Sequence, residues 1–142
     1  MFHFMSHFHR GLLPRLAAMT LALGGATTAL AQDIEVPGTG QNQSAQLSLP
    51  PGSRACLGAV KGNVFLRATG DADGRLTYFM RRSTTNTQGS YSRIAFSDVT
   101  ARQYDFTVDS DNRPDLFPGF FKVCATNNGT ASVRVKLTLQ GE

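Results

Sequence analysis

The sequence has few histidines and no tryptophan, and both absences limit what the protein can do. Its three histidines, His3, His7 and His9, all lie at the N-terminal end of the chain. The rest of the chain therefore has no imidazole base for a Ser-His-Asp or Cys-His nucleophile. It also lacks the histidine ligands of the usual zinc sites. Without Trp, the best aromatic platform for stacking a sugar ring is missing as well.

The N-terminal segment has no acidic residue and reads as a secretory signal. Arg10 and Arg15 precede an apolar run, residues 16–30, that ends in the small-residue motif Ala29-Leu30-Ala31. A basic end, an apolar middle and an A-x-A site are typical of a cleaved signal peptide. The run is also shorter than the ~20 residues that a membrane-spanning helix needs. We therefore expect residues 1–31 to be a signal, cleaved near Ala31, and the mature protein to be periplasmic or extracellular.

The mature chain has no second long apolar segment and little net charge. We expect it to have no membrane span. Twelve basic and ten acidic residues remain after residue 31, which leaves a net charge of +2. So weak a balance does not favour a nucleic-acid partner.

Only two cysteines are present, Cys56 and Cys124, and both lie in the mature chain. An even number of cysteines in an oxidising compartment indicates a disulfide. The bridge would close a loop of 68 residues, for which chain entropy gives at most roughly 4 kcal/mol of stabilisation. Whether it joins two sheets or two neighbouring strands is left open by the sequence.

The mature chain shows short segments of alternating apolar and polar residues and no helical stripe. Residues 32–44 are polar and contain Pro and Gly, so we expect a flexible N-terminal arm followed by one domain at 45–142. Alternation with a period of two predicts strands that bury one face. The expected strands are 45–49, 54–60, 64–69, 75–81, 91–96, 103–108, 119–126 and 132–139.

Clusters of turn-forming residues separate these segments. Residues 70–74 predict a turn, and Asn128-Gly129 predicts a hairpin between strands 119–126 and 132–139. Seven or eight short strands at regular spacing favour a single antiparallel β-sandwich with one disulfide. The fold class is therefore all-β.

Two segments resemble a known type of bacterial domain. They are the run Leu47–Gly52, with its Pro-Gly turn, and the ending Gly119–Cys124 followed by 130–139. Together they resemble the pre-peptidase C-terminal type of secreted β-sandwich, over about residues 45–139. The resemblance implies a non-catalytic accessory module, usually attached to a secreted hydrolase.

An acidic loop is the only candidate cation site. Calcium takes several oxygen ligands from loops rich in Asp and Asn, and a second acidic turn at 71–73 could share an ion with this loop. The alternative is that these side chains cap turns through local hydrogen bonds. The candidate ligands are Asp109, Asp111, Asn112 and Asp115.

A polar loop at 83–90 is the candidate recognition loop, because binding sites on sandwiches usually lie in loops held by rigid sheets. The alternative is a mobile hairpin connection. Its candidate residues, with those that flank it, are Arg81, Arg82, Asn86, Gln88, Tyr91 and Arg93.

The leading functional hypothesis is a non-enzymatic β-sandwich that binds a protein or a cell-surface component of the envelope. The alternatives are a calcium- or glycan-binding accessory module, in which Tyr78, Phe79 or Tyr91 would stack a ring, and a small carboxylate-dependent hydrolase. No catalytic residue and no cofactor other than calcium is expected. The carboxylates open to the hydrolase are Glu35, Asp98, Asp105, Asp109, Asp111, Asp115 and Glu142.

Overall fold

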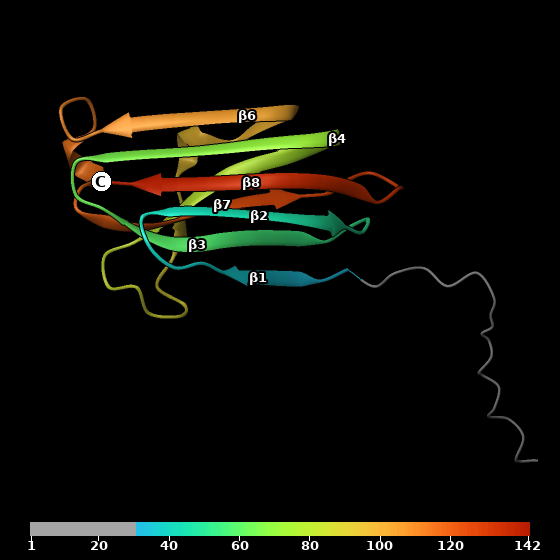
Figure 1. The fold of residues 1–142 in the computed structure, drawn as a ribbon, viewed down its shortest axis with the longest axis horizontal. Helices are drawn as coiled ribbons and strands as arrows, with labels where there is room; N and C mark the ends of the chain where they lie inside the picture. The colour runs from blue at the N-terminus through green and yellow to red at the C-terminus, as the bar shows by residue number, and fades with distance from the viewer. Residues whose placement is uncertain (1–30) are drawn as a thin grey trace, which may run out of the picture.

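The structure is a computed structural model that describes residues 31–142 (Figure 1). The expected signal peptide lies outside the described residues, apart from Ala31. No helix within residues 31–142 has the length and apolar character needed to cross a bilayer. The strands are β1 (Asp33–Pro37), β2 (Asn42–Leu49), β3 (Arg54–Gly62), β4 (Phe65–Ser83), β5 (Ser92–Arg93), β6 (Val99–Asp109), β7 (Gly119–Thr126) and β8 (Val133–Gly141).

The eight strands form one hydrogen-bonded sheet that folds over on itself into two layers. The long strand β4 takes part in both layers, as Figure 1 shows from its green front part and its yellow-green part behind. The first half of β4 pairs with β8, which pairs with β2 at the edge. The second half pairs with β7, which pairs with β3 and then β1. Strand β6 lies along the other edge of β4 in both halves.

The core lies between the two layers and is made by the alternate apolar residues of each strand. The side chains of Leu66, Tyr78, Phe121 and Leu137 are all at or below 1% exposure. The all-β class, the strand number and the single disulfide are therefore confirmed. One departure is that β1 runs parallel to β3, whereas the other strand pairs are antiparallel.

The disulfide joins neighbouring strands of one layer. Cys56 of β3 and Cys124 of β7 are directly opposite each other in the strand register, with their Cα atoms 4.0 Å apart. Both side chains form a small cluster with Phe79, separate from the main core. The bridge therefore fixes the register of β3 against β7.

The expected flexible arm contains a strand. In β1, Ile34 and Val36 pack against the core, while Asp33 and Glu35 alternate with them and face outward. An ion pair joins Asp33 to Arg54 of β3 at 3.1 Å. Two apolar residues are enough to hold β1 in place because β1 pairs with the edge strand β3, which supplies its backbone hydrogen bonds.

The turn expected at residues 70–74 is instead the middle of β4. Asp71 and Leu76 are separated by a register shift against β6, so the strand bends without ending. Gly70 faces the ring of Tyr78, which occupies the space that a Cβ would need. Its lack of a side chain thus serves a close approach within a strand. The expected strand at 91–96 is likewise reduced to β5, followed by a short 3-10 helix at Ala95–Ser97.

The hairpin expected at Asn128-Gly129 is wrong, because β7 and β8 pair with other strands and belong to different layers. The buried side chain of Asn127 directs the chain between the layers. Its Nδ2 donates to the carbonyls of Leu49 and Ala131, both at 2.8 Å, and its Oδ1 accepts from the backbone N–H of Gly129 at 2.9 Å.

Replacement of Asn127 should therefore lower the free energy of unfolding much more than replacement of the neighbouring Asn128. Asn127→Ala leaves the buried Leu49 carbonyl without its side-chain donor, and we expect a loss of about 2–3 kcal/mol. Asn128 is exposed and makes one hydrogen bond, to Thr77, so Asn128→Ala should cost about 0.5 kcal/mol. Urea denaturation of both variants measures the difference. Equal losses would contradict this account of the 127–132 connection.

Candidate binding surfaces

The expected recognition loop lies against the outer face of the β3–β7–β4 layer and is held at both ends. Ser83 accepts hydrogen bonds from the backbone N–H groups of Thr85 and Asn86, both at 3.0 Å. At the other end, the Tyr91 carbonyl accepts from Arg81 Nη2 at 3.3 Å. The Tyr91 hydroxyl donates to Asn86 Oδ1. Arg81, Asn86 and Tyr91 are thus brought together, whereas Gln88 lies exposed between them.

Tyr91 also contacts an ion pair on the sheet below. The Lys122 ammonium lies 4.5 Å from the centre of the Tyr91 ring and 2.9 Å from Glu35 Oε1. Partial burial and then the Glu35 carboxylate raise the pKa of the Tyr91 hydroxyl, while Arg81 opposes them. The hydroxyl therefore stays protonated at neutral pH and remains a hydrogen-bond donor.

Of the other two predicted arginines, Arg82 belongs to a different site. Arg93 lies directly opposite Arg81 in the strand register and stacks on Phe79, on the same face as Arg81. Successive residues of a strand point to opposite faces, so Arg82 turns away from Arg81 and the loop. It lines a cleft of about 290 Å³ together with Arg93 of β5 and Arg113. Arg113 precedes the short 3-10 helix at Pro114–Leu116. The remaining lining residues are Ser92, Ile94, Ala95, Phe96 and Leu116.

We call this surface the arginine cleft, after Arg82, Arg93 and Arg113 in its lining. Each of the three side chains is held by neighbouring groups of the fold. Arg82 donates from Nε to the Leu116 carbonyl at 2.6 Å and from Nη2 to the Pro118 carbonyl at 3.0 Å. The Arg93 guanidinium lies 3.7 Å from the centre of the Phe79 ring. Both guanidinium groups are therefore positioned before any ligand binds, that of Arg82 in the cleft and that of Arg93 on the Phe79 side of the strand.

Arg113 stacks on an aromatic ring and binds one carboxylate. Its guanidinium lies 3.9 Å from the centre of the Phe96 ring. It also donates to both oxygens of Asp115, at 2.9 and 2.7 Å. The hydrogen bond from Arg113 is the main cause that lowers the pKa of the Asp115 carboxyl. The same hydrogen bond raises the pKa of the Arg113 guanidinium. Asp115 is therefore committed to Arg113 at neutral pH.

Phe96 is the exposed apolar group at this cleft. Its side chain is 49% exposed, whereas Ile94 and Leu116 are 6% and 7% exposed and form the floor. The Phe96 ring is supported from behind by Phe106, with ring centres 5.8 Å apart. A half-exposed ring in one cleft with Arg82 and Arg113 combines an apolar contact with directed hydrogen-bond donors.

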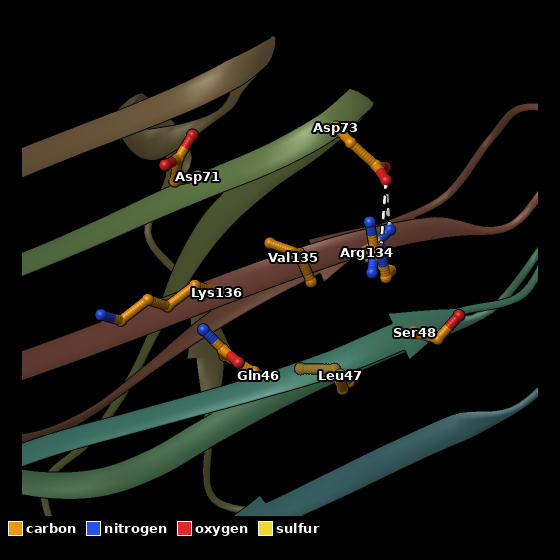
Figure 2. A pocket seen from close by; sticks show the side chains of 8 residues that line it. All are labelled: Gln46, Leu47, Ser48, Asp71, Asp73, Arg134, Val135 and Lys136. Carbon is orange, nitrogen blue, oxygen red and sulfur yellow. Dashed lines mark hydrogen bonds and ion pairs between the residues drawn. The ribbon is translucent and has the colours of Figure 1, made fainter.

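A second groove, of about 490 Å³, crosses the outer face of the other layer (Figure 2). Asp71 and Asp73 of β4 face Arg134 and Lys136 of β8 across it, and Gln46 and Ser48 of β2 close its other side. Its two positive and two negative side chains balance.

Half of those charges are already paired. Asp73 accepts the backbone N–H of Arg134 at 2.9 Å and pairs with its guanidinium at 3.4 Å. The backbone hydrogen bond is the main cause that lowers the pKa of Asp73. The sequence indicates this face through the polar residues that alternate along 132–139, but nothing in the sequence marks it as a groove.

The acidic loop is organised by hydrogen bonds within the loop itself. Asp109 Oδ1 accepts the backbone N–H groups of Asp111 and Asn112 at 3.0 and 2.9 Å, and its Oδ2 accepts the Asn112 amide at 3.2 Å. Within residues 31–142 no group of three or more His, Cys, Asp or Glu residues is arranged to hold a metal ion.

The second acidic turn does not reach this loop. Asp71 pairs with Gln103, and Phe65, six positions earlier on β4, pairs with Asp109. At about 3.3 Å per residue the two turns are roughly 20 Å apart along the strand. They cannot share one ion.

Calcium should therefore leave the stability of the protein unchanged. Thermal unfolding with and without about 5 mM calcium tests this, because an ion that binds only the folded state raises Tm. We expect no shift, since the Asp109 oxygens already accept N–H groups and Asp115 is paired with Arg113. A rise of several degrees that Asp109→Asn abolishes would contradict the expectation.

The side chains considered for sugar stacking and for acid–base chemistry are largely occupied. Tyr78 and Phe79 are 0% and 2% exposed, so neither ring is open to a glycan. Four of the candidate carboxylates form ion pairs on the surface. These are Glu35 with Lys122, Asp98 with Arg93, Asp105 with Arg67, and Asp115 with Arg113.

Comparisons with known proteins give two similar folds. No family model matches the chain, and no curated protein matches it. A periplasmic inhibitor of g-type lysozyme from Aeromonas hydrophila is 8% identical, with 78% of this chain and 98% of that chain covered and a TM-score of 0.49. The pre-peptidase C-terminal domain of a Bacillus anthracis collagenase is 11% identical, with 80% and 100% covered and a TM-score of 0.42. The second is a domain of the type that the sequence resembles.

Proposed function

We propose that the protein is a non-enzymatic binding domain that acts outside the cytoplasm by contact with a protein of the cell envelope. The observation that carries this proposal is the arginine cleft, in which the fixed guanidinium groups of Arg82 and Arg113 accompany the half-exposed ring of Phe96. Arginine and aromatic residues are the side chains most enriched at the energetic centres of protein interfaces.

The rigidity of the cleft supports a role in binding. Ordering a long side chain at an interface costs about 0.5–1.5 kcal/mol. Here the guanidinium groups of Arg82, Arg93 and Arg113 are already held by carbonyls, rings and carboxylates. A partner that binds these guanidinium groups avoids most of this entropic cost. A partner that bound freely exposed side chains elsewhere on the surface would have to order them.

The chemistry of the described residues supports a non-catalytic role. Residues 31–142 contain no histidine. Ion pairing lowers the pKa of Asp105 and Asp115, and general acid catalysis requires a protonated group near the operating pH. Both thiols are used in the disulfide. A hydrolase would have to rely on the few carboxylates that remain.

The disulfide supports a location outside the cytoplasm. Such bridges form and persist in oxidising environments such as the periplasm and the extracellular space, and they are rare in the cytosol. Together with the expected signal at 1–31, the disulfide supports a partner among envelope or extracellular proteins.

Affinity capture tests the proposed function. The full chain, tagged at its C-terminus through a flexible linker, is expressed in its own host and captured from the native envelope, with partners identified by mass spectrometry. We expect one reproducible protein that Phe96→Ala removes, because the exposed ring is a central contact of the proposed surface.

Val64→Ala is the matched control. Val64 is 54% exposed and Phe96 is 49% exposed, so both substitutions remove exposed apolar surface with little effect on folding. Capture that survives Val64→Ala and fails with Phe96→Ala supports the proposal. No reproducible partner, or a partner retained by Phe96→Ala, would overturn it. Replacement of residues 83–90 by a Gly/Ser loop should leave capture intact, because that loop lies on a different face from the cleft.

A further inference from the structure

We propose that the arginine cleft recognises an acidic segment of the partner protein, in which an Asp or Glu carboxylate binds Arg82 and a neighbouring apolar side chain packs on Phe96. The inference rests on the proposed function and specifies the partner's chemistry. It follows from the charges, the hydrogen bonds and the exposed surface of this cleft.

The charge of the cleft wall is positive. Its lining includes Arg82, Arg93 and Arg113 and no acidic residue, and of these arginines Arg93 directs its guanidinium onto Phe79, outside the lining. The nearest acidic partners are Asp98, 3.3 Å from Arg93, and Asp115, 2.7 Å from Arg113. They pair with two of the three arginines from outside the lining and leave the third, Arg82, without a carboxylate among the ion pairs of residues 31–142.

Arg82 has donors left for such a carboxylate. A guanidinium carries five N–H groups. Two of its nitrogens, Nε and Nη2, each donate to a backbone carbonyl, of Leu116 and Pro118. Both hydrogens of Nη1 and one of Nη2 remain, and the plane of the group is fixed by the two bonds it makes. A ligand carboxylate that accepts from these hydrogens completes the coordination of the guanidinium, and an Arg–carboxylate pair is stronger and more directional than a neutral hydrogen bond.

The apolar part of the ligand is specified by Phe96. Its ring is positioned by contacts with the Arg113 guanidinium, 3.9 Å from the ring centre, and with the ring of Phe106. With about half of its surface still open, it offers an apolar platform next to the cations. A free inorganic anion would use only the arginines, whereas an acidic peptide with an adjacent apolar residue uses both.

The groove on the opposite layer lacks this preference. There Asp71 and Asp73 balance Arg134 and Lys136, and no aromatic ring lines it (Figure 2). An acidic ligand would meet as much repulsion as attraction at that surface. The acidic segment is therefore assigned to the arginine cleft.

Fluorescence polarisation with labelled synthetic peptides tests the inference on the full mature chain. One probe is a short peptide in which Glu alternates with Phe, and its matched control has every Glu replaced by Gln. We expect the Glu peptide to bind at least tenfold more tightly than the Gln peptide. The binding should weaken as salt is raised, because the cleft is open to solvent.

Two variants locate the binding. Arg82→Lys keeps the charge but loses the fixed fork of donors, and we expect about a tenfold loss of affinity for the Glu peptide. Phe96→Ala should cause a similar loss. Arg102→Gln is the control, because Arg102 is exposed and outside the cleft, and it should bind as wild type. Thermal unfolding checks that each variant is folded. If Arg82→Lys fails to fold, Phe96→Ala and Arg102→Gln still decide the result.

The outcomes separate the two proposals. Equal binding of the two peptides, or binding that Phe96→Ala does not change, overturns the acidic-segment inference. Tight binding of a labelled oligothymidine in place of the Glu peptide also overturns it and points to a nucleic-acid ligand. If capture from the envelope still depends on Phe96 while the Glu peptide does not bind, the proposed function stands and only this inference fails.

Discussion

The pairing of strand β4 on both of its edges is the constraint on which the rest of the structure depends. One edge pairs with β6 along most of its length, and the other pairs with β8 and then with β7. A single strand that belongs to both layers leaves little freedom in how they are placed over the core. It also sets the two surfaces described here, because Asp71 and Asp73 lie at its bend and Arg82 lies near its end.

Much of the fold could be predicted from the sequence because period-two alternation is a local signal. Strand β7 matches its predicted bounds, and β3 and β8 differ from theirs by one or two residues. Strand β1 was missed because two apolar residues among Pro, Gly and Gln give too short a pattern, and its stability comes from the edge of β3. The 70–74 segment was misread because Gly and Asp favour turns, whereas here they allow a long strand to bend under the ring of Tyr78.

The hairpin and the cleft were beyond local patterns for a different reason. Asn128-Gly129 is a strong hairpin signal on its own, and it is overridden by Asn127, whose amide binds a carbonyl 78 residues away. The sequence does place Arg82 and Arg93 in one candidate site. It gives no indication that the side chains of Arg81 and Arg82 point to opposite faces of β4. Nor does it indicate that Arg113 of the acidic loop lines the same cleft as Arg82. The pairing of β4 with β5 and the position of the 3-10 helix at Pro114–Leu116 bring the lining residues of the cleft together.

The disulfide has a mechanical consequence that follows from its place in the chain. The first two strands, β1 and β2, are both at sheet edges, so tension applied from the N-terminal side can strip them away one after the other. The third strand cannot follow beyond residue 56, because a covalent bond ties it to β7 at that position. The long strand β4, its partners and the arginine cleft all lie on the far side of that stop. Under tension from the N-terminal end, the disulfide therefore stops the loss of strands before it reaches the arginine cleft.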